Sequence, residues 1–135
     1  MEDETLSDSF WGVARRLRHL TRETLAPWDI TPSQSRALTV VMRAGTLRLS
    51  ELAEHLHIAA RSATEVVDDL EQRGLAERRP DPADRRATLV ALTEAGTAAG
   101  QAIAAARAAE AESFFGALSP DDRADLSRIL RKLRD

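Results

Sequence analysis

Apolar residues recur every three or four positions along most of the chain, a spacing that places them on one face of an α-helix. The first such stripe predicts an amphipathic helix over residues 5–26, which Pro27 ends. A second helix is predicted to begin at Thr31-Pro32-Ser33-Gln34 and to end near Gly45. Its start combines a threonine cap, a proline at the first helical position and a glutamine three residues after the cap.

Two shorter helical segments follow, separated by only about three residues. The first spans about residues 49–56, with Ser50 as its expected N-terminal cap. The second runs from about residue 60 to Gly74, a glycine of the kind that closes helix C-termini. Two short helices joined by such a turn are typical of a helix-turn-helix, although other helical proteins contain similar pairs. The side chains expected to be buried in the second helix are Ala63, Val66, Val67 and Leu70.

A hairpin is predicted directly after this helix pair. Residues 75–79 and 87–92 have the pattern of two strands, and residues 80–86 between them are rich in turn-forming and charged residues. A helix pair followed at once by a hairpin with a basic tip predicts a winged helix.

Two further helices are predicted on the C-terminal side of the hairpin. Thr93 caps the first, in which ten of the 17 residues from 95 to 111 are alanine, a strong helix former. Gly96 and Gly100 are four residues apart and allow close packing, either within one chain or between two chains. Ser119 and Pro120 begin the last helix.

The order of these elements resembles the MarR family of transcription regulators over essentially the whole chain. The most specific match is Asp81–Gly96, which is similar to the family's wing: an acidic residue and an arginine at the tip, then a strand ending in Leu-Thr-x-x-Gly. Residues 70–75 also fit the family's exit from its recognition helix. The resemblance implies a mainly α fold with a small β-wing, in which a winged helix-turn-helix core is flanked by N- and C-terminal dimerisation helices.

The same resemblance sets the expected organisation and function. Residues 1–135 would form a single domain, with a DNA-binding lobe over 31–93 and a helical dimerisation region over 1–30 and 94–135. The protein is expected to be a sequence-specific regulator that binds a pseudo-palindromic double-stranded DNA operator as a homodimer. Such proteins are usually repressors, and many are released by small, often aromatic, acids.

The predicted recognition helix presents polar side chains near its start. Because one face of such a helix is buried, the opposite face enters the major groove. Arg61 can donate a pair of hydrogen bonds to guanine, while Glu65 can accept a hydrogen bond from a cytosine amine. Two departures from the family pattern weaken this face: Glu65 and Asp69 are acidic, and Ala59 stands where a hydroxyl cap is usual. The candidates for DNA contact are Arg61, Ser62, Thr64 and Glu65, the alternative being that they are merely solvated.

The wing supplies the second set of candidates. In the geometry that the resemblance implies, Arg86 enters the minor groove, where narrow A·T tracts attract arginine. Arg85 meets a phosphate, and Asp84 holds the tip by bonding to backbone or to Arg86. Arg78 and Arg79 point to opposite faces of a strand, so one of the two is a further phosphate candidate.

Ser33 and Arg36 are candidates for contact with the DNA backbone. Both lie in the first turns of the second helix, and helix N-termini favour phosphate groups.

The net charge of −3 does not exclude DNA, because the charges are unevenly distributed. Residues 31–93 hold nine arginines against nine acids, and residues 72–86 hold five arginines against three acids. The excess of acids lies in residues 1–30 and 94–135. Arginine supplies 18 of the 19 basic residues, either through codon bias or because its planar fork suits phosphates and guanine edges.

Catalytic and metal-binding classes find little support. The chain contains no cysteine and no Gly-x-Gly or phosphate-binding loop, so no cofactor is expected. His55 and His57 are two residues apart on a helix and cannot share a face, and His19 stands alone, so no metal site is expected.

The location follows from similar exclusions. The acidic start lacks the basic region of a secretory signal, and no apolar run approaches the length of a membrane span. We therefore expect a cytoplasmic protein with no membrane partner.

An effector cleft is expected where the dimer helices meet the DNA-binding lobe. Its candidate lining combines apolar walls with a cation for a carboxylate, the alternative being that the tryptophans are core or dimer interface. The candidates are Trp11, Arg15, His19, Trp28, Arg36 and Met42.

A different class of function also remains open. A winged helix can serve protein contact without binding DNA, and the acidic Glu65 and Asp69 favour that alternative. A small enzyme is the third class, and no residue pattern supports it. The operator, the regulated genes, the effector and the choice between repression and activation are not readable from the sequence.

Overall fold

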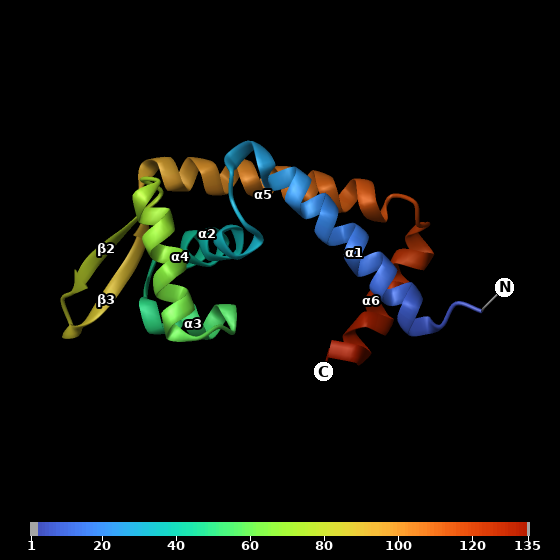
Figure 1. Cartoon of the computed structure of the whole chain (residues 1–135), viewed down its shortest axis with the longest axis horizontal. Helices are drawn as coiled ribbons and strands as arrows, with labels where there is room; N and C mark the ends of the chain where they lie inside the picture. The colour runs from blue at the N-terminus through green and yellow to red at the C-terminus, as the bar shows by residue number, and fades with distance from the viewer. Residues whose placement is uncertain (1–2, 135) are drawn as a thin grey trace.

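The elements form an arch in the computed structural model, which describes residues 3–134 (Figure 1). The winged lobe forms one leg, the ends of α1 and α6 form the other, and the long helix α5 crosses above them. Met1 and Glu2, which belong to the acidic start that lacks the basic region of a secretory signal, lie outside the described residues. No helix in 3–134 is long and apolar enough to cross a membrane.

Within these residues the chain forms six α-helices, a 3-10 helix and three strands. The fold class predicted from the sequence is therefore confirmed. The elements are α1 (Leu6–Leu25), η1 (Ala26–Trp28), α2 (Pro32–Ala44), β1 (Thr46–Arg48), α3 (Leu49–Leu56), α4 (Ala60–Gln72), β2 (Ala76–Asp81), β3 (Asp84–Leu92), α5 (Glu94–Phe115) and α6 (Pro120–Arg134).

The second helix begins as its sequence predicts. The Thr31 hydroxyl accepts from the backbone N–H of Gln34 at 3.2 Å, and the Gln34 amide oxygen accepts from the Thr31 N–H at 3.1 Å. Gly45 follows the last residue of the helix. Local hydrogen bonding therefore determines where α2 begins.

The third helix differs from its prediction. Ser50 is not its cap but its second residue, and Arg48 occupies the cap position. The Glu51 carboxylate accepts from the Arg48 N–H at 3.0 Å and satisfies the helix start in place of a serine hydroxyl. The short strand β1, which ends at Arg48, was missed because three residues carry too little alternation to be recognised.

The hairpin is longer than predicted. Its strands continue to Asp81 and resume at Asp84, so the turn is only Pro82-Ala83 rather than residues 80–86. Pro80 is accommodated because β2 is an edge strand of the sheet, whose order is β1-β3-β2. All pairs are antiparallel, with Leu47 opposite Val90 and Arg78 opposite Val90 on the other side.

The apolar core lies between the lobe helices, the sheet and the middle of α5. Three of the four residues predicted to be buried on α4 are buried, whereas Val66 is only half-buried at the edge of the core. The largest fully buried apolar side chains are Leu25, Leu38, Leu52, Leu70, Ile103, Val41, Val67 and Val90.

A backbone contact joins α5 to the end of α4. Gly74 has a φ of 73° and closes α4, with its N–H donating to the Glu71 carbonyl at 2.9 Å. The Thr93 hydroxyl donates to the Gly74 carbonyl at 2.6 Å. A Cβ at Gly96 would lie 1.8 Å from the Leu75 carbonyl oxygen, so only glycine fits there. Gly100 packs against Met42, and the glycine pair therefore serves close packing within one chain.

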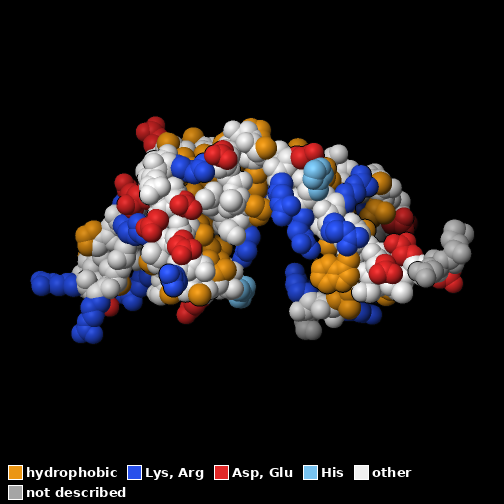
Figure 2. Space-filling view, in the orientation of Figure 1, with side chains coloured by type: hydrophobic (Ala, Val, Ile, Leu, Met, Phe, Trp, Pro, Cys, Tyr) orange, Lys and Arg blue, Asp and Glu red, His pale blue; other side chains and the backbone are white. Residues whose placement is uncertain are grey.

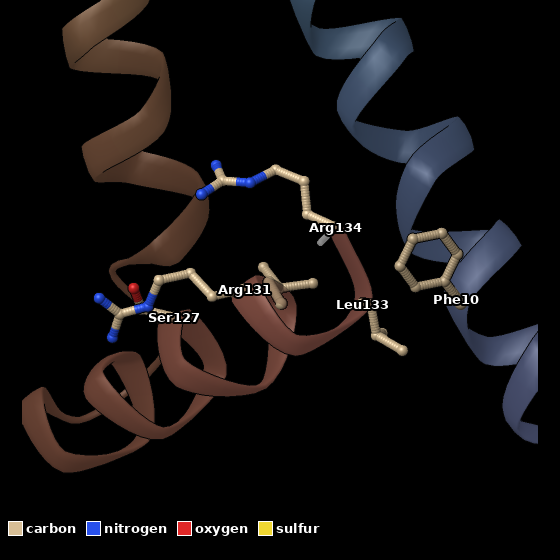
Figure 3. A pocket seen from close by; sticks show the side chains of 6 residues that line it. Phe10, Ser127, Arg131, Leu133 and Arg134 are labelled. Carbon is tan, nitrogen blue, oxygen red and sulfur yellow. The ribbon is translucent and has the colours of Figure 1, made fainter.

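The opposite leg of the arch leaves apolar side chains exposed. Leu6 of α1 is 88% exposed and Leu133 of α6 is 72% exposed, and α6 buries none of its described residues. An open groove of about 500 Å³ lies between the two helices, with Phe10 on the α1 side and Leu133 on the α6 side (Figure 3). This leg lacks a covering layer within residues 3–134.

Candidate nucleic-acid interface

The start of α4 presents the polar face expected of a recognition helix. Arg61, Ser62 and Glu65 are exposed, whereas Thr64 is half-buried and its hydroxyl donates to the Ala60 carbonyl at 3.1 Å. The Arg61 Nε lies 3.9 Å from the Glu65 carboxylate, with side chains 92% and 70% exposed. Because so exposed a pair is weakly held, both side chains can reorient toward a ligand.

The first turn of α4 has no side-chain cap. Ala59 occupies the cap position in an extended conformation and offers no oxygen to the N–H groups that follow. The absence of a hydroxyl at Ala59 therefore has a structural consequence, because the first N–H groups of α4 have no side-chain acceptor.

Asp69 is exposed on α4, like Glu65, but it also contacts α2. Its carboxylate accepts from the Gln34 side-chain amide at 3.4 Å, which links α4 to the start of α2. Glu65 and Asp69, the two acids expected to weaken the DNA-binding face, are therefore both exposed, and Asp69 also contacts α2.

The two arginines of β2 are engaged by acids. The Arg78 guanidinium donates to Asp68 at 2.5 Å and to Glu71 at 3.2 Å, which ties the wing to α4. Arg79 bonds to the Glu77 carboxylate on its own strand. Their predicted phosphate contacts would compete with these ion pairs.

The arginines of the wing tip are placed differently. Arg85 and Arg86 are exposed, and neither side chain makes an ion pair with any residue from 3 to 134. The Asp84 carboxylate accepts from the Arg86 backbone N–H at 3.0 Å, the kind of tip contact expected for it. Basic side chains project from the end of the wing in Figure 2.

A buried carboxylate that sequence reasoning missed holds the wing to the rest of the lobe. Asp81 accepts from the Ala83 N–H at 2.8 Å and from the Arg48 Nε at 2.9 Å. The Ala83 N–H lowers the pKa of Asp81 below 3.8, burial opposes this shift, and Arg48 adds to it. The Asp-Pro dipeptide signals a turn, but Arg48 lies 33 residues away and leaves no local signal.

Ser33 and Arg36 lie on α2, next to the helix-turn-helix. Ser33 is exposed in the first turn. The Arg36 guanidinium donates to the Leu56 carbonyl at 2.7 Å and closes the C-terminus of α3. A contact of Arg36 with DNA would therefore use the remaining guanidinium N–H groups.

An open cleft of about 340 Å³ lies beside the wing at the start of α3. The wing contributes Asp84 and Arg86 to it, and α3 contributes Ser50. Ser50, expected only as a cap, thus lies close to the candidate DNA-binding side chains.

The predicted effector candidates do not share one environment. Trp11, Arg15 and His19 are exposed on α1, and the His19 Nε2 lies 3.0 Å from the Glu23 carboxylate. Trp28 packs against the core, and Met42 packs against Gly100. The cavity of about 570 Å³ bounded by α1, α2 and α5 is lined by none of the six candidates. Across residues 3–134, no group of three metal-ligating side chains is present.

The comparisons with known proteins agree with this geometry. Residues 28–87 match the sequence model of the MarR family. The transcriptional repressor MdtR of Bacillus subtilis is 26% identical over 134 residues, covering 97% of this chain and 86% of that protein. A mutant MarR of E. coli complexed with operator DNA superposes with a TM-score of 0.84 at 29% identity, covering 95% of this chain and 92% of that one.

A second similar structure was solved in a study of regulation by a small molecule. Bordetella bronchiseptica BpsR, whose DNA binding is regulated by 6-hydroxynicotinic acid, superposes with a TM-score of 0.82 at 27% identity, covering 98% of this chain and 94% of that one. Fold, wing and sequence matches agree: this chain belongs to the MarR family of winged-helix transcription regulators.

Proposed function

We propose that the protein binds an inverted-repeat operator in double-stranded DNA as a homodimer and represses transcription from it, acting in the cytoplasm and not as an enzyme. The observation that carries this proposal is the wing tip, where Arg85 and Arg86 are exposed and make no ion pair within residues 3–134. The E. coli MarR structure complexed with operator DNA supports this use of the fold.

In this proposal each part of the lobe has a distinct role. The face of α4 that carries Arg61, Ser62 and Glu65 reads base edges in the major groove. Arg86 enters the adjacent minor groove, and Arg85 neutralises a phosphate. Arg78, Asp84 and Asp81 act on the wing itself, by holding it against α4, shaping its tip and anchoring it to Arg48.

The dimer is supported by the exposed leg of the arch. Apolar side chains of α1 and α6 surround an open groove, and a large exposed apolar patch on a regulator is the usual mark of an interface. A second copy would cover this patch and place two lobes on the two halves of a palindrome. The exposed apolar side chains are Leu6, Phe10, Trp11, Val13, Ile129, Leu130 and Leu133.

Selection of bound DNA from a random pool tests the function. We expect an enriched inverted repeat whose half-sites lie about one helical turn apart, because a twofold dimer presents two recognition helices at that spacing. Enrichment of a single, unrepeated site would contradict the dimer, and no enrichment would contradict sequence-specific binding.

The alternative of a protein-interaction module rests on the acidic Glu65 and Asp69, which are both exposed on α4. Salt dependence separates the two functions. Affinity for DNA falls steeply as salt rises because counterions leave the phosphates, and we expect that behaviour here. Absence of DNA binding at about 50 mM salt would favour the protein-interaction module.

We further propose that a small aromatic or phenolic ligand releases the repressor from DNA. The BpsR study on 6-hydroxynicotinic acid supports this proposal by likeness, and the cavity of about 570 Å³ has a suitable size. Release of the selected DNA on addition of such acids is the expected result, and an unchanged gel shift across a broad panel would contradict it.

A further inference from the structure

The cleft of about 340 Å³ beside the wing is lined by donors from two elements, which lie at the same end of the lobe (Figure 1). Arg86 lines it from β3, and Arg48 lines it from the residue that precedes α3. The hydroxyl groups of Ser50 and Thr88 add neutral donors, and Asp84 adds one acid. Two positive charges therefore face one negative charge in the described lining, which favours a small anion.

Arg48 is held in this lining by a buried carboxylate. Its Nε donates to Asp81 at 2.9 Å, and the Asp81 side chain is only 8% exposed. The Ala83 N–H lowers the pKa of Asp81, burial opposes this shift and Arg48 adds to it, so the carboxylate is charged at neutral pH. The Arg48 side chain is itself 40% exposed. A guanidinium bonded through its Nε keeps its remaining N–H groups available to a second acceptor.

The position of Arg86 indicates which anion the cleft would meet. In the proposed complex Arg86 enters a minor groove, which is only about 6 Å wide and is bordered by phosphates on both sides. Because Arg86 and Arg48 line one cleft, the backbone strand on the α3 side of Arg86 would pass within reach of Arg48. The planar guanidinium suits this acceptor, since it can donate two parallel hydrogen bonds to a phosphate.

We propose that the cleft binds one phosphate group of the DNA backbone, with Arg48 as its principal ligand and the Ser50 hydroxyl as a second donor. Asp81 is then a positioning residue, because it would touch no phosphate and acts by holding the Arg48 guanidinium at the cleft. This inference rests on the proposed function and assigns DNA contacts to two further residues. The alternative is that Arg48 only anchors the wing, and the two roles differ in their dependence on salt.

The salt dependence of binding to the selected operator tests the proposal. The full chain is titrated by fluorescence anisotropy between about 50 and 200 mM salt, where each neutralised phosphate contributes about 0.9 to the slope of log affinity against log salt. We expect Arg48→Met to reduce this slope by about 1.8 for a dimer, which carries two copies of Arg48, and to weaken binding at least about tenfold. A slope equal to that of the wild type would overturn the proposal, whatever the loss of affinity.

Two further variants separate phosphate binding from wing anchoring. Asp81→Asn removes the charge that holds Arg48 but keeps the Arg48 charge itself, so we expect weaker binding with an unchanged salt slope. Arg73→Met is the matched control, since Arg73 is 36% exposed and pairs with Asp29 but does not line the cleft. It should leave the slope unchanged. Equal reductions of the slope in Arg48→Met and Asp81→Asn would overturn the assignment to Arg48.

Ser50→Asp tests the cleft without altering either partner of the Arg48–Asp81 bond. Ser50 is exposed in the first turn of α3, where an acid interacts favourably with the helix dipole, so this variant should fold. Its carboxylate would repel a phosphate in the cleft, and we expect operator affinity to fall at least about tenfold. An unchanged affinity would overturn the proposal.

The same titrations distinguish failure of this site from failure of the proposed function. If the wild type binds no DNA, both are overturned. If the wild type binds with a steep salt slope that Arg48→Met retains, only the phosphate site is overturned. Inorganic phosphate without DNA tests for a site that takes the free anion. A melting temperature that phosphate raises in the wild type but not in Arg48→Met, with equal DNA salt slopes, would overturn the assignment to the DNA backbone.

Discussion

The winged lobe and the leg formed by α1 and α6 are built from similar amphipathic helices, yet only the lobe buries its apolar stripes. In the lobe, Leu52 and Leu70 are fully buried against neighbouring elements. In the leg, Leu6 and Leu133 remain exposed within the single chain. The difference teaches that helical spacing identifies an apolar face, while the rest of the structure determines whether the same chain covers it.

The arginines of the lobe also differ in their partners. Arg36, Arg48 and Arg78 are each engaged by a carbonyl or carboxylate of the lobe. Arg85 and Arg86 have no such partner within residues 3–134. The wing-tip arginines are thus available to DNA without breaking a contact inside the lobe.

The joint between α4 and α5 should be the most sensitive position in the chain. In Gly96→Ala the new methyl would clash with the Leu75 carbonyl, and we expect a loss of about 3 kcal/mol in the free energy of unfolding. Gly12→Ala is the matched control, since its Cβ meets nothing closer than 3.8 Å and alanine favours a helix by about 1 kcal/mol. Denaturant titration measures the free energy of unfolding of both variants. Equal values would contradict the close contact between Gly96 and the Leu75 carbonyl.

A charge at the open leg should break the proposed dimer. Leu133→Glu is expected to raise the dimer dissociation constant at least about 30-fold, because the carboxylate would be buried without a partner. Lys132→Glu, one residue away on the same helix, is the control and should change it little. Analytical ultracentrifugation gives both constants, and a stable Leu133→Glu dimer would place the interface elsewhere.

The contrast between paired and unpaired arginines predicts unequal effects on DNA binding. Arg86→Ala should weaken operator binding at least about tenfold, through loss of a minor-groove contact. Arg79→Ala should have a smaller effect, because Arg79 already bonds to Glu77. Gel-shift titration at fixed salt is the measurement. An unchanged affinity in Arg86→Ala would falsify that role.

Loss of the Asp81 charge, which anchors the wing to Arg48, should have the smallest effect of these substitutions. That effect, on the melting temperature, should depend on pH. Because the folded-state pKa of Asp81 is lowered, its contribution to stability is present above its ordinary pKa of 3.8 and is lost as pH falls through the lowered value. Asp81→Asn should therefore lower the melting temperature at pH 7, with the gap closing in acid. A gap independent of pH would contradict the role of the Asp81 charge, and Arg48→Met should reproduce part of the neutral-pH loss.

Much of the fold was predictable because its signals are local. The Thr31–Gln34 cap and the Gly74 terminus involve groups three to five residues apart. An apolar stripe or an apolar–polar alternation likewise depends only on residues within one helix or strand. The errors have the same origin. The sequence predicts Ser50 as a cap because the strand before it is too short to recognise, and it predicts too long a turn because an edge strand also tolerates proline and charge.

The candidate site was predictable only as a set of surfaces. The polar face of α4 and the basic wing tip follow from sequence, and their DNA contacts stay predictions. Which arginines are already bonded does not follow, since the partners of Arg36 and Arg48 lie 20 and 33 residues away. The cavity bounded by α1, α2 and α5 does not follow from sequence for the same reason, because Thr21 and Glu110, which bond to each other in its lining, are 89 residues apart.

The sequence by itself determined the order of elements and the resemblance to the MarR family, because caps, breaks and apolar spacing act within a few residues. Tertiary structure alone decided which arginines are already bonded and which apolar faces remain open. Each of those properties is set by distances of a few ångströms between segments far apart in the chain, and a linear pattern does not record such distances.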